Sequence, residues 1–81
     1  MKQNKKNIQK IKINTEMIQL DQLLKWGNVL STGGQIKGLL ENEEIYVNGE
    51  VCTAKRKQLH HGDVVDIKKL GTYLVVYEKE S

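Results

Sequence analysis

The stretch that decides the fold spans residues 20–50 and reads LDQLLKWGNVLSTGGQIKGLLENEEIYVNGE. Its first part has leucines at helical spacing, which predicts a short helix over residues 20–26 with Gly27 at its C-cap. Asp21 in the first turn and Lys25 in the last turn are placed favourably for the helix dipole. The stretch therefore begins with a helix that turns one apolar face inward.

A second helix is predicted to start at Thr32. Thr32 and Gln35 have the spacing of a capping box, in which the Thr side chain caps the first turn. Ile36 and the leucines that follow it lie on one face at helical spacing, with Lys37 turned away from that face. This helix is expected to end near Asn42.

The rest of the chain reads as β structure. Residues 45–47 predict a strand, and Asn48-Gly49 predicts a tight hairpin because both residues accept positive φ. Alternation and turn signals predict further segments: strands over 10–14, 50–53, 64–67 and 73–77, a polar basic loop over 55–58, and Leu59 packed inward. Two short helices packed on a small antiparallel sheet make an α+β domain.

Length and composition favour one small domain. A chain of 81 residues supports a modest core, which suits a surface binding module better than an elaborate buried active site. Residues 10–81 are expected to form the domain, and residues 1–9 a flexible basic tail. No apolar run approaches a membrane span, and the single Cys52 fits a reducing compartment, so a cytoplasmic protein is expected.

The charge distribution is uneven, although the formal net charge is only +3. Residues 1–14 contain lysines and no acid, residues 15–50 are mainly acidic, and basic residues return together at 55–57. This pattern predicts one anion-attracting face. For the first segment alone, a solubilising disordered tail is the alternative interpretation.

The start of the second predicted helix is the first candidate binding site. A helix N-terminus presents unpaired N–H groups and attracts phosphate. Gly33 and Gly34 leave room for the close approach of another backbone, and Lys37 lies one turn further along. The plainer interpretation is that Thr32 only caps the helix and the glycines only shape the turn.

The second candidate site is the run Lys55-Arg56-Lys57, which follows the hairpin. Adjacent cations on a loop can meet successive phosphates, and Arg56 can bind one phosphate through two parallel hydrogen bonds. The alternative is a solvated loop that serves only solubility.

Other candidate chemistries receive less support. Trp26 could stack on a base, but full or partial burial is expected because large aromatic side chains are mostly buried. His60 and His61 point to opposite faces of a strand and lack neighbours with zinc-ligand spacing. No nucleophile–base set and no phosphate-loop motif is present. The sequence therefore predicts no metal, no cofactor and no enzymatic activity.

Taken in order, these signals resemble the S-four RNA-binding domain, named after ribosomal small-subunit protein four. The resemblance is carried by LDQLLK (20–25), STGGQIK (31–37), VNGE (47–50), KRKQL (55–59) and GDVV (62–65). The stretch around Thr32 looks most like that of the stand-alone bacterial subgroup often called YaaA-like. The resemblance implies the αL RNA-binding motif, with two helices on a small antiparallel sheet, and the binding of structured ribosomal or transfer RNA.

The resemblance also implies a binding face, formed by the end of the first helix, the start of the second helix and the basic loop. With the two glycines of the first candidate site, this face comprises Lys25, Thr32, Gly33, Gly34, Gln35, Lys37, Lys55, Arg56 and Lys57. Gln19, Ser31 and Gly33 stand where many members of the family have basic residues. Fewer phosphate contacts are therefore expected at those positions.

Three other functions remain open at this point. A protein-interaction adaptor, on a ribosome or in nucleic-acid metabolism, would use the acidic residues 41–44 and the sheet. The targeting domain of an RNA-modifying enzyme would need its catalytic part on a separate subunit. DNA binding would differ by the absence of contacts to a 2′-hydroxyl.

Overall fold

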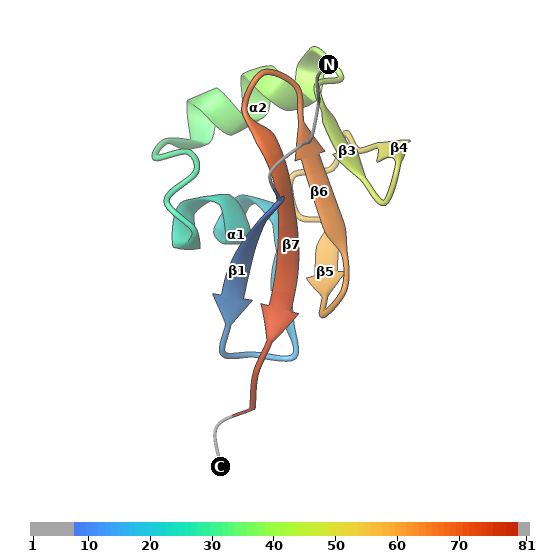
Figure 1. The fold of residues 1–81 in the computed structure, drawn as a ribbon. Helices are drawn as coiled ribbons and strands as arrows, with labels where there is room; N and C mark the ends of the chain where they lie inside the picture. Colours follow the sequence, from blue (N-terminus) through green and yellow to red (C-terminus); the bar gives the residue numbers. More distant parts are fainter. Residues whose placement is uncertain (1–7, 80–81) are drawn as a thin grey trace.

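A computed structural model describes residues 8–79 of the protein. The elements in this range are β1 (Ile8–Ile13), β2 (Met17–Gln19), α1 (Leu20–Trp26), α2 (Gly33–Glu41), β3 (Ile45–Val47), β4 (Glu50–Val51), β5 (Gln58–His60), β6 (Val64–Ile67) and β7 (Gly71–Tyr77). Both helices lie on the same side of the main sheet and run in roughly opposite directions (Figure 1). The predicted α+β class, with two helices on a sheet, is confirmed.

The main sheet is mixed, which corrects the prediction of an antiparallel sheet. Its strand order is β1-β7-β6-β3-β4. The first and last strands, β1 and β7, pair in parallel, while the other pairs are antiparallel. The direction of β1 depends on where the chain crosses over afterwards, and alternation within one strand carries no information about that.

The local signals between residues 20 and 50 are confirmed. α1 has the predicted bounds, and α2 begins directly after Thr32, whose Oγ1 accepts a hydrogen bond of 3.2 Å from the Gln35 N–H. Asn48 and Gly49 both have positive φ, at 52° and 88°. Each of these features depends on neighbouring residues only, so the sequence was sufficient to predict it.

The strand boundaries required corrections. β1 begins at Ile8, inside the segment predicted as a flexible tail, and residues 1–7 lie outside the described range. β2 was not predicted, and it pairs with β5 in a second, two-stranded sheet. The basic loop was predicted over residues 55–58, but it ends at Lys57 because Gln58 belongs to β5. Leu59 is fully buried, as expected.

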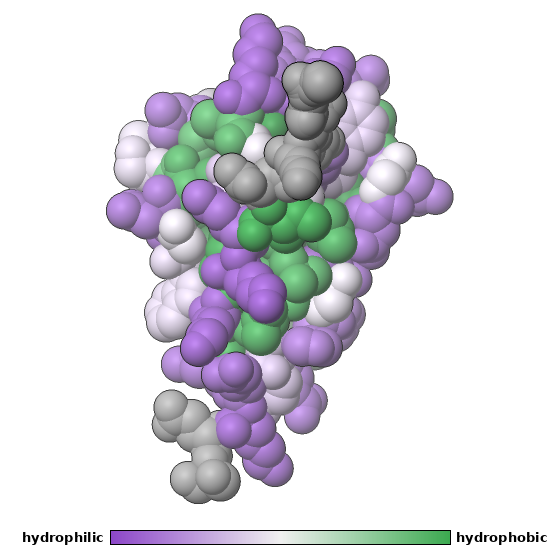
Figure 2. Space-filling model, in the orientation of Figure 1, coloured by the Kyte–Doolittle hydropathy of each residue, from purple (hydrophilic) through white to green (hydrophobic). Residues whose placement is uncertain are grey.

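One hydrophobic core lies between the helices and the sheet. It contains Ile11 and Ile13 of β1, Leu20, Leu23 and Leu24 of α1, Ile36 and Leu40 of α2, and inward residues of the remaining strands, including Leu59. On the other face of the sheet, side chains of neighbouring strands lie side by side. Leu74 of β7, for example, lies between Lys10 of β1 and Val64 of β6. Figure 2 shows hydrophobic residues over these strands, bordered by hydrophilic ones.

Gly27 is the C-cap of α1, as predicted, but for a different physical reason. Its φ is −83°, and the left-handed residue at this helix end is Asn28, with φ 59°. A Cβ on Gly27 would lie 2.7 Å from Cδ1 of Ile11. A larger residue here would displace the Ile11 side chain, because α1 ends in close contact with β1.

Candidate nucleic-acid interface

The side chains of Thr32 and Gln35 build the start of α2. Thr32 Oγ1 accepts the Gln35 N–H, and the Thr32 carbonyl accepts the Ile36 N–H at 3.4 Å. Gln35 Oε1 accepts the N–H of Ser31 at 3.3 Å, so the reciprocal bond of the capping box is displaced by one residue. Both side chains are committed to the helix start and can shape a binding site only indirectly.

The two glycines of the first turn leave an open surface. Gly33 and Gly34 have no positive φ, and a Cβ built on either one meets no atom within 4 Å. Among the described residues, their N–H groups donate no hydrogen bond. Neither backbone strain nor internal packing therefore requires glycine here, although glycine costs a helix up to about 1 kcal/mol relative to alanine. The first turn is open to close approach from outside.

The backbone of the predicted basic loop is fixed against the start of α1. The carbonyl of Lys55 accepts the Asp21 N–H at 3.0 Å, and the carbonyl of Lys57 accepts the Leu20 N–H at 2.8 Å. These two bonds satisfy N–H groups that a helix start leaves unpaired. The Lys55, Arg56 and Lys57 side chains remain exposed. The loop thus presents three cations from a held backbone.

Tertiary folding brings Lys37 and Lys55 to one surface hollow. Leu40, Glu41, Glu43 and Thr53 complete its lining. Neither lysine forms an ion pair with another residue in the described range. The hollow therefore joins the exposed side of α2 to the basic loop, and its two carboxylates reduce the positive potential there.

Lys25 stands apart from this hollow. It lies in the last turn of α1, whereas the basic loop is bonded to the first turn, about 8 Å away along the helix axis. Because α1 and α2 run in opposite directions, the end of α1 lies toward the start of α2 (Figure 1). The predicted residues thus form two groups: Lys37 with the basic loop, and Lys25 toward Thr32–Gln35.

Comparison with known proteins identifies the family of this chain. The family model described as "S4 domain" matches residues 11–76, from β1 to β7. The chain belongs to the S4 domain family. The probable ribosome maturation protein RlbA of Bacillus subtilis (strain 168) is 42% identical over 66 residues, which cover 82% of this chain and 93% of that relative. The family predicted from the sequence is confirmed, and the matched segment contains every predicted site residue.

Trp26 of this S4 domain is exposed, which corrects the expected burial. Its exposed fraction is 57%. The indole Nε1–H donates to the Lys12 carbonyl oxygen at 2.6 Å. The sequence held a signal for this position, because Leu20, Leu23 and Leu24 form the buried stripe of α1. Two residues beyond Leu24, the helix has turned by about 200° and faces away from the core.

The histidines of the S4 domain take part in hydrogen bonds at strand ends. The His60 N–H donates to Asp63 Oδ2 at 2.7 Å, and His61 Nδ1 accepts the Tyr77 N–H at 3.0 Å. Within residues 8–79, no three His, Cys, Asp or Glu side chains are grouped so as to hold a metal ion. No helix in this range is long and apolar enough to cross a membrane.

Proposed function

We propose that this S4 domain is a non-enzymatic protein that binds structured RNA through phosphate contacts and shape. The observation that carries the proposal is the hollow shared by Lys37 and Lys55, beside a basic loop whose backbone is held by α1. Because the loop backbone is already held, it loses little conformational freedom when its exposed cations neutralise phosphates, which lowers the entropy cost of binding. The αL-type use of the two helices is part of this proposal.

Double-helical RNA suits this surface better than a specific sequence does. The deep major groove of A-form RNA excludes side chains, so proteins read its phosphates, 2′-hydroxyls and shape. In the proposed complex, Lys37 and the open first turn of α2 hold one strand, and residues 55–57 hold the neighbouring strand. Lys25 extends the contact beyond the start of α2.

Ribosomal RNA is the favoured partner, with transfer RNA as the second choice. The support for this choice is the relative named as a probable ribosome maturation protein. Such a partner places the protein in the cytoplasm, in association with ribosomes or their precursors. The competing proposal, a protein-interaction adaptor, is favoured by one observation: Glu41 and Glu43 line the same hollow as the two lysines.

Fluorescence anisotropy over a salt series tests the proposal, with ribosomal RNA fragments, transfer RNA and a matched DNA duplex as ligands. Structured RNA should bind more tightly than DNA, with a steep salt dependence. Replacing Lys55, Arg56 and Lys57 by Ala should lower the affinity and reduce the slope of log K against log salt by about two to three.

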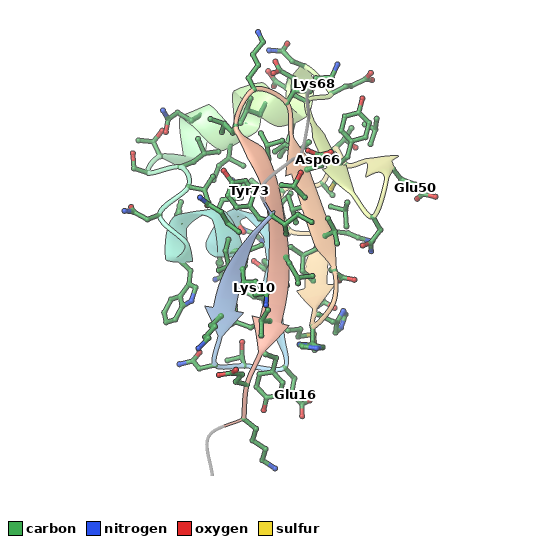
Figure 3. The ribbon with its side chains drawn as sticks, viewed as in Figure 1. Lys10, Glu16, Glu50, Asp66, Lys68 and Tyr73 are labelled. Atoms are coloured by element: carbon green, nitrogen blue, oxygen red, sulfur yellow. The ribbon has the colours of Figure 1, made fainter. Side chains whose placement is uncertain are left out.

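A control variant removes positive charge away from the proposed interface. Lys10 lies on the outer face of the sheet (Figure 3), and Lys79 follows β7. Replacing these two by Ala should change affinity much less for each charge removed than the loop variant does. Equal losses per charge in the two variants would mean that RNA binds by general charge attraction and would count against the proposed interface.

A further inference from the structure

Trp26 is a large aromatic residue on the surface, in the last turn of α1. It is the only tryptophan of the chain, and its exposed fraction is 57%. Tryptophan is highly buried on average, and exposing its ring sacrifices much of the gain from burial. The fold does not use most of this ring surface for its core, so the ring is available to a ligand.

The ring is nevertheless held in place. Its Nε1–H, the one hydrogen-bond donor of the side chain, is bonded to the Lys12 carbonyl at 2.6 Å. α1 itself is anchored by Leu20, Leu23 and Leu24, which are fully buried. With the indole edge and the helix both fixed, the flat faces of the ring are what it can offer a ligand. A fixed ring also loses little freedom when a ligand stacks on it.

An exposed cation lies next to Trp26 in the helix. Lys25 directly precedes it, and the Lys25 side chain is exposed. Lys12 contributes its backbone carbonyl, while its side chain pairs at the surface with Glu78, at 3.6 Å. An exposed ring with a cation on the same helical turn suits a ligand that carries both phosphate and an aromatic base.

We propose that Trp26 is a stacking platform for an unpaired nucleobase of the bound RNA. This inference rests on the proposed function and adds a preference to it. A base within a duplex is stacked on both sides, whereas a bulged or loop base has a free face that an aromatic side chain can cover. The S4 domain then prefers a stem with an unpaired nucleotide over a continuous stem.

Two hairpin RNAs with the same stem test this inference, one fully paired and one with a single-nucleotide bulge. Anisotropy should show about tenfold tighter binding of the bulged hairpin, the order expected for one stacked base. The intrinsic fluorescence of Trp26 should be quenched by the bulged hairpin and much less by the paired one at equal saturation. Equal affinities with equal quenching would overturn the inference.

Three variants separate stacking from structural support. Trp26→Leu should lower the affinity for the bulged hairpin to that for the paired one, while Trp26→Phe, which keeps a ring but loses the N–H, should retain most of the preference. Tyr46→Leu, on β3, is the aromatic control and should leave the preference unchanged. A Trp26→Phe variant that folds but shows no preference would also refute stacking.

The outcomes distinguish this inference from the function on which it rests. If both hairpins bind with steep salt dependence but without preference, RNA binding stands and the stacking role of Trp26 fails. If neither hairpin binds while the protein is folded, the proposed function fails and the stacking role fails with it.

Discussion

The indole Nε1–H of Trp26 donates a hydrogen bond of 2.6 Å to the backbone carbonyl of Lys12. This bond joins the last turn of α1 to β1, the edge strand of the main sheet. It occupies a carbonyl that an edge strand otherwise offers to another chain. An exposed side chain therefore connects the helix layer to the sheet.

Loss of this bond should be measurable in the free energy of unfolding. Trp26→Phe keeps an aromatic ring and removes the donor, so it should destabilise the domain by about 1 kcal/mol. Urea denaturation followed by circular dichroism measures this change. An unchanged midpoint would mean that water replaces the indole N–H at Lys12 without cost.

Gly34→Ala should stabilise the domain and weaken its binding to RNA. Gly34 has no positive φ and a Cβ there meets no atom within 4 Å, so alanine should add about 0.5 kcal/mol through its helix propensity. The same methyl group would obstruct a phosphate that approaches the first turn of α2. Denaturation and anisotropy on the same variant measure the two effects.

Gly49→Ala is the control for the backbone argument. Gly49 also has open space around it, but its φ is 88°, so alanine should destabilise the domain by about 1 kcal/mol. The Gly34→Ala variant could prove more stable and still bind RNA with unchanged affinity. That result would show that no phosphate comes close to residue 34.

Asp63 should be important for stability through the hydrogen bonds that join two turns. Its Oδ1 accepts from Asn48 Nδ2 at 3.1 Å and its Oδ2 from the His60 N–H at 2.7 Å. Asn48 Oδ1 in turn accepts the Val64 N–H at 2.9 Å. Asp63→Ala should cost about 1 kcal/mol, since it removes two hydrogen bonds whose donors lie at the surface and can bind water instead.

Two variants of Asn48 separate its hydrogen bonds from its backbone conformation. Both Asn48→Ala and Asn48→Gly lose the side-chain bonds, but the φ of 52° is strained only for alanine. Asn48→Gly should therefore be the more stable of the two by about 1 kcal/mol. Equal unfolding midpoints would show that the hairpin conformation contributes nothing to the effect.

Glu41→Gln should strengthen RNA binding by about two- to threefold, a change typical of one exposed charge pair. Glu41 lines the hollow with Lys37 and Lys55, where its charge repels phosphate. Glu16→Gln is the control, because Glu16 lies at the end of the molecule opposite α2 (Figure 3). An adaptor that uses the acidic residues would instead lose affinity for its protein partner in Glu41→Gln, with no gain for RNA.

The features that the sequence predicted correctly depend on residues that are close together in the chain. The bounds of α1, the Thr32 cap and the Asn48-Gly49 hairpin each depend on residues within a few positions of one another. The residue types of the candidate site were predictable for the same reason, since glycines at a helix start and a run of cations are visible without a fold.

The mutual placement of the site residues was less predictable. Lys37 and Lys55 lie 18 positions apart in the sequence, and only the tertiary fold brings them to one hollow. The acidic neighbours of these lysines, Glu41 and Glu43, were predicted as an adaptor surface and not as part of the same hollow. Trp26 was expected to be fully or partly buried because of its residue type, although its helical position turned it outward.

By itself, the sequence determined the two helices, the hairpin, the inward leucines and the family, because caps, turn residues and apolar spacing act locally. Only the tertiary structure decided that β1 runs parallel to β7, that β2 pairs with β5 and that the basic loop caps α1. The three residues of β2 show too little alternation to be predicted as a strand, and the alternation in β1 does not reveal its direction. The partner and direction of each strand depend on how all apolar segments are buried together. The sequence of one segment alone therefore does not determine them.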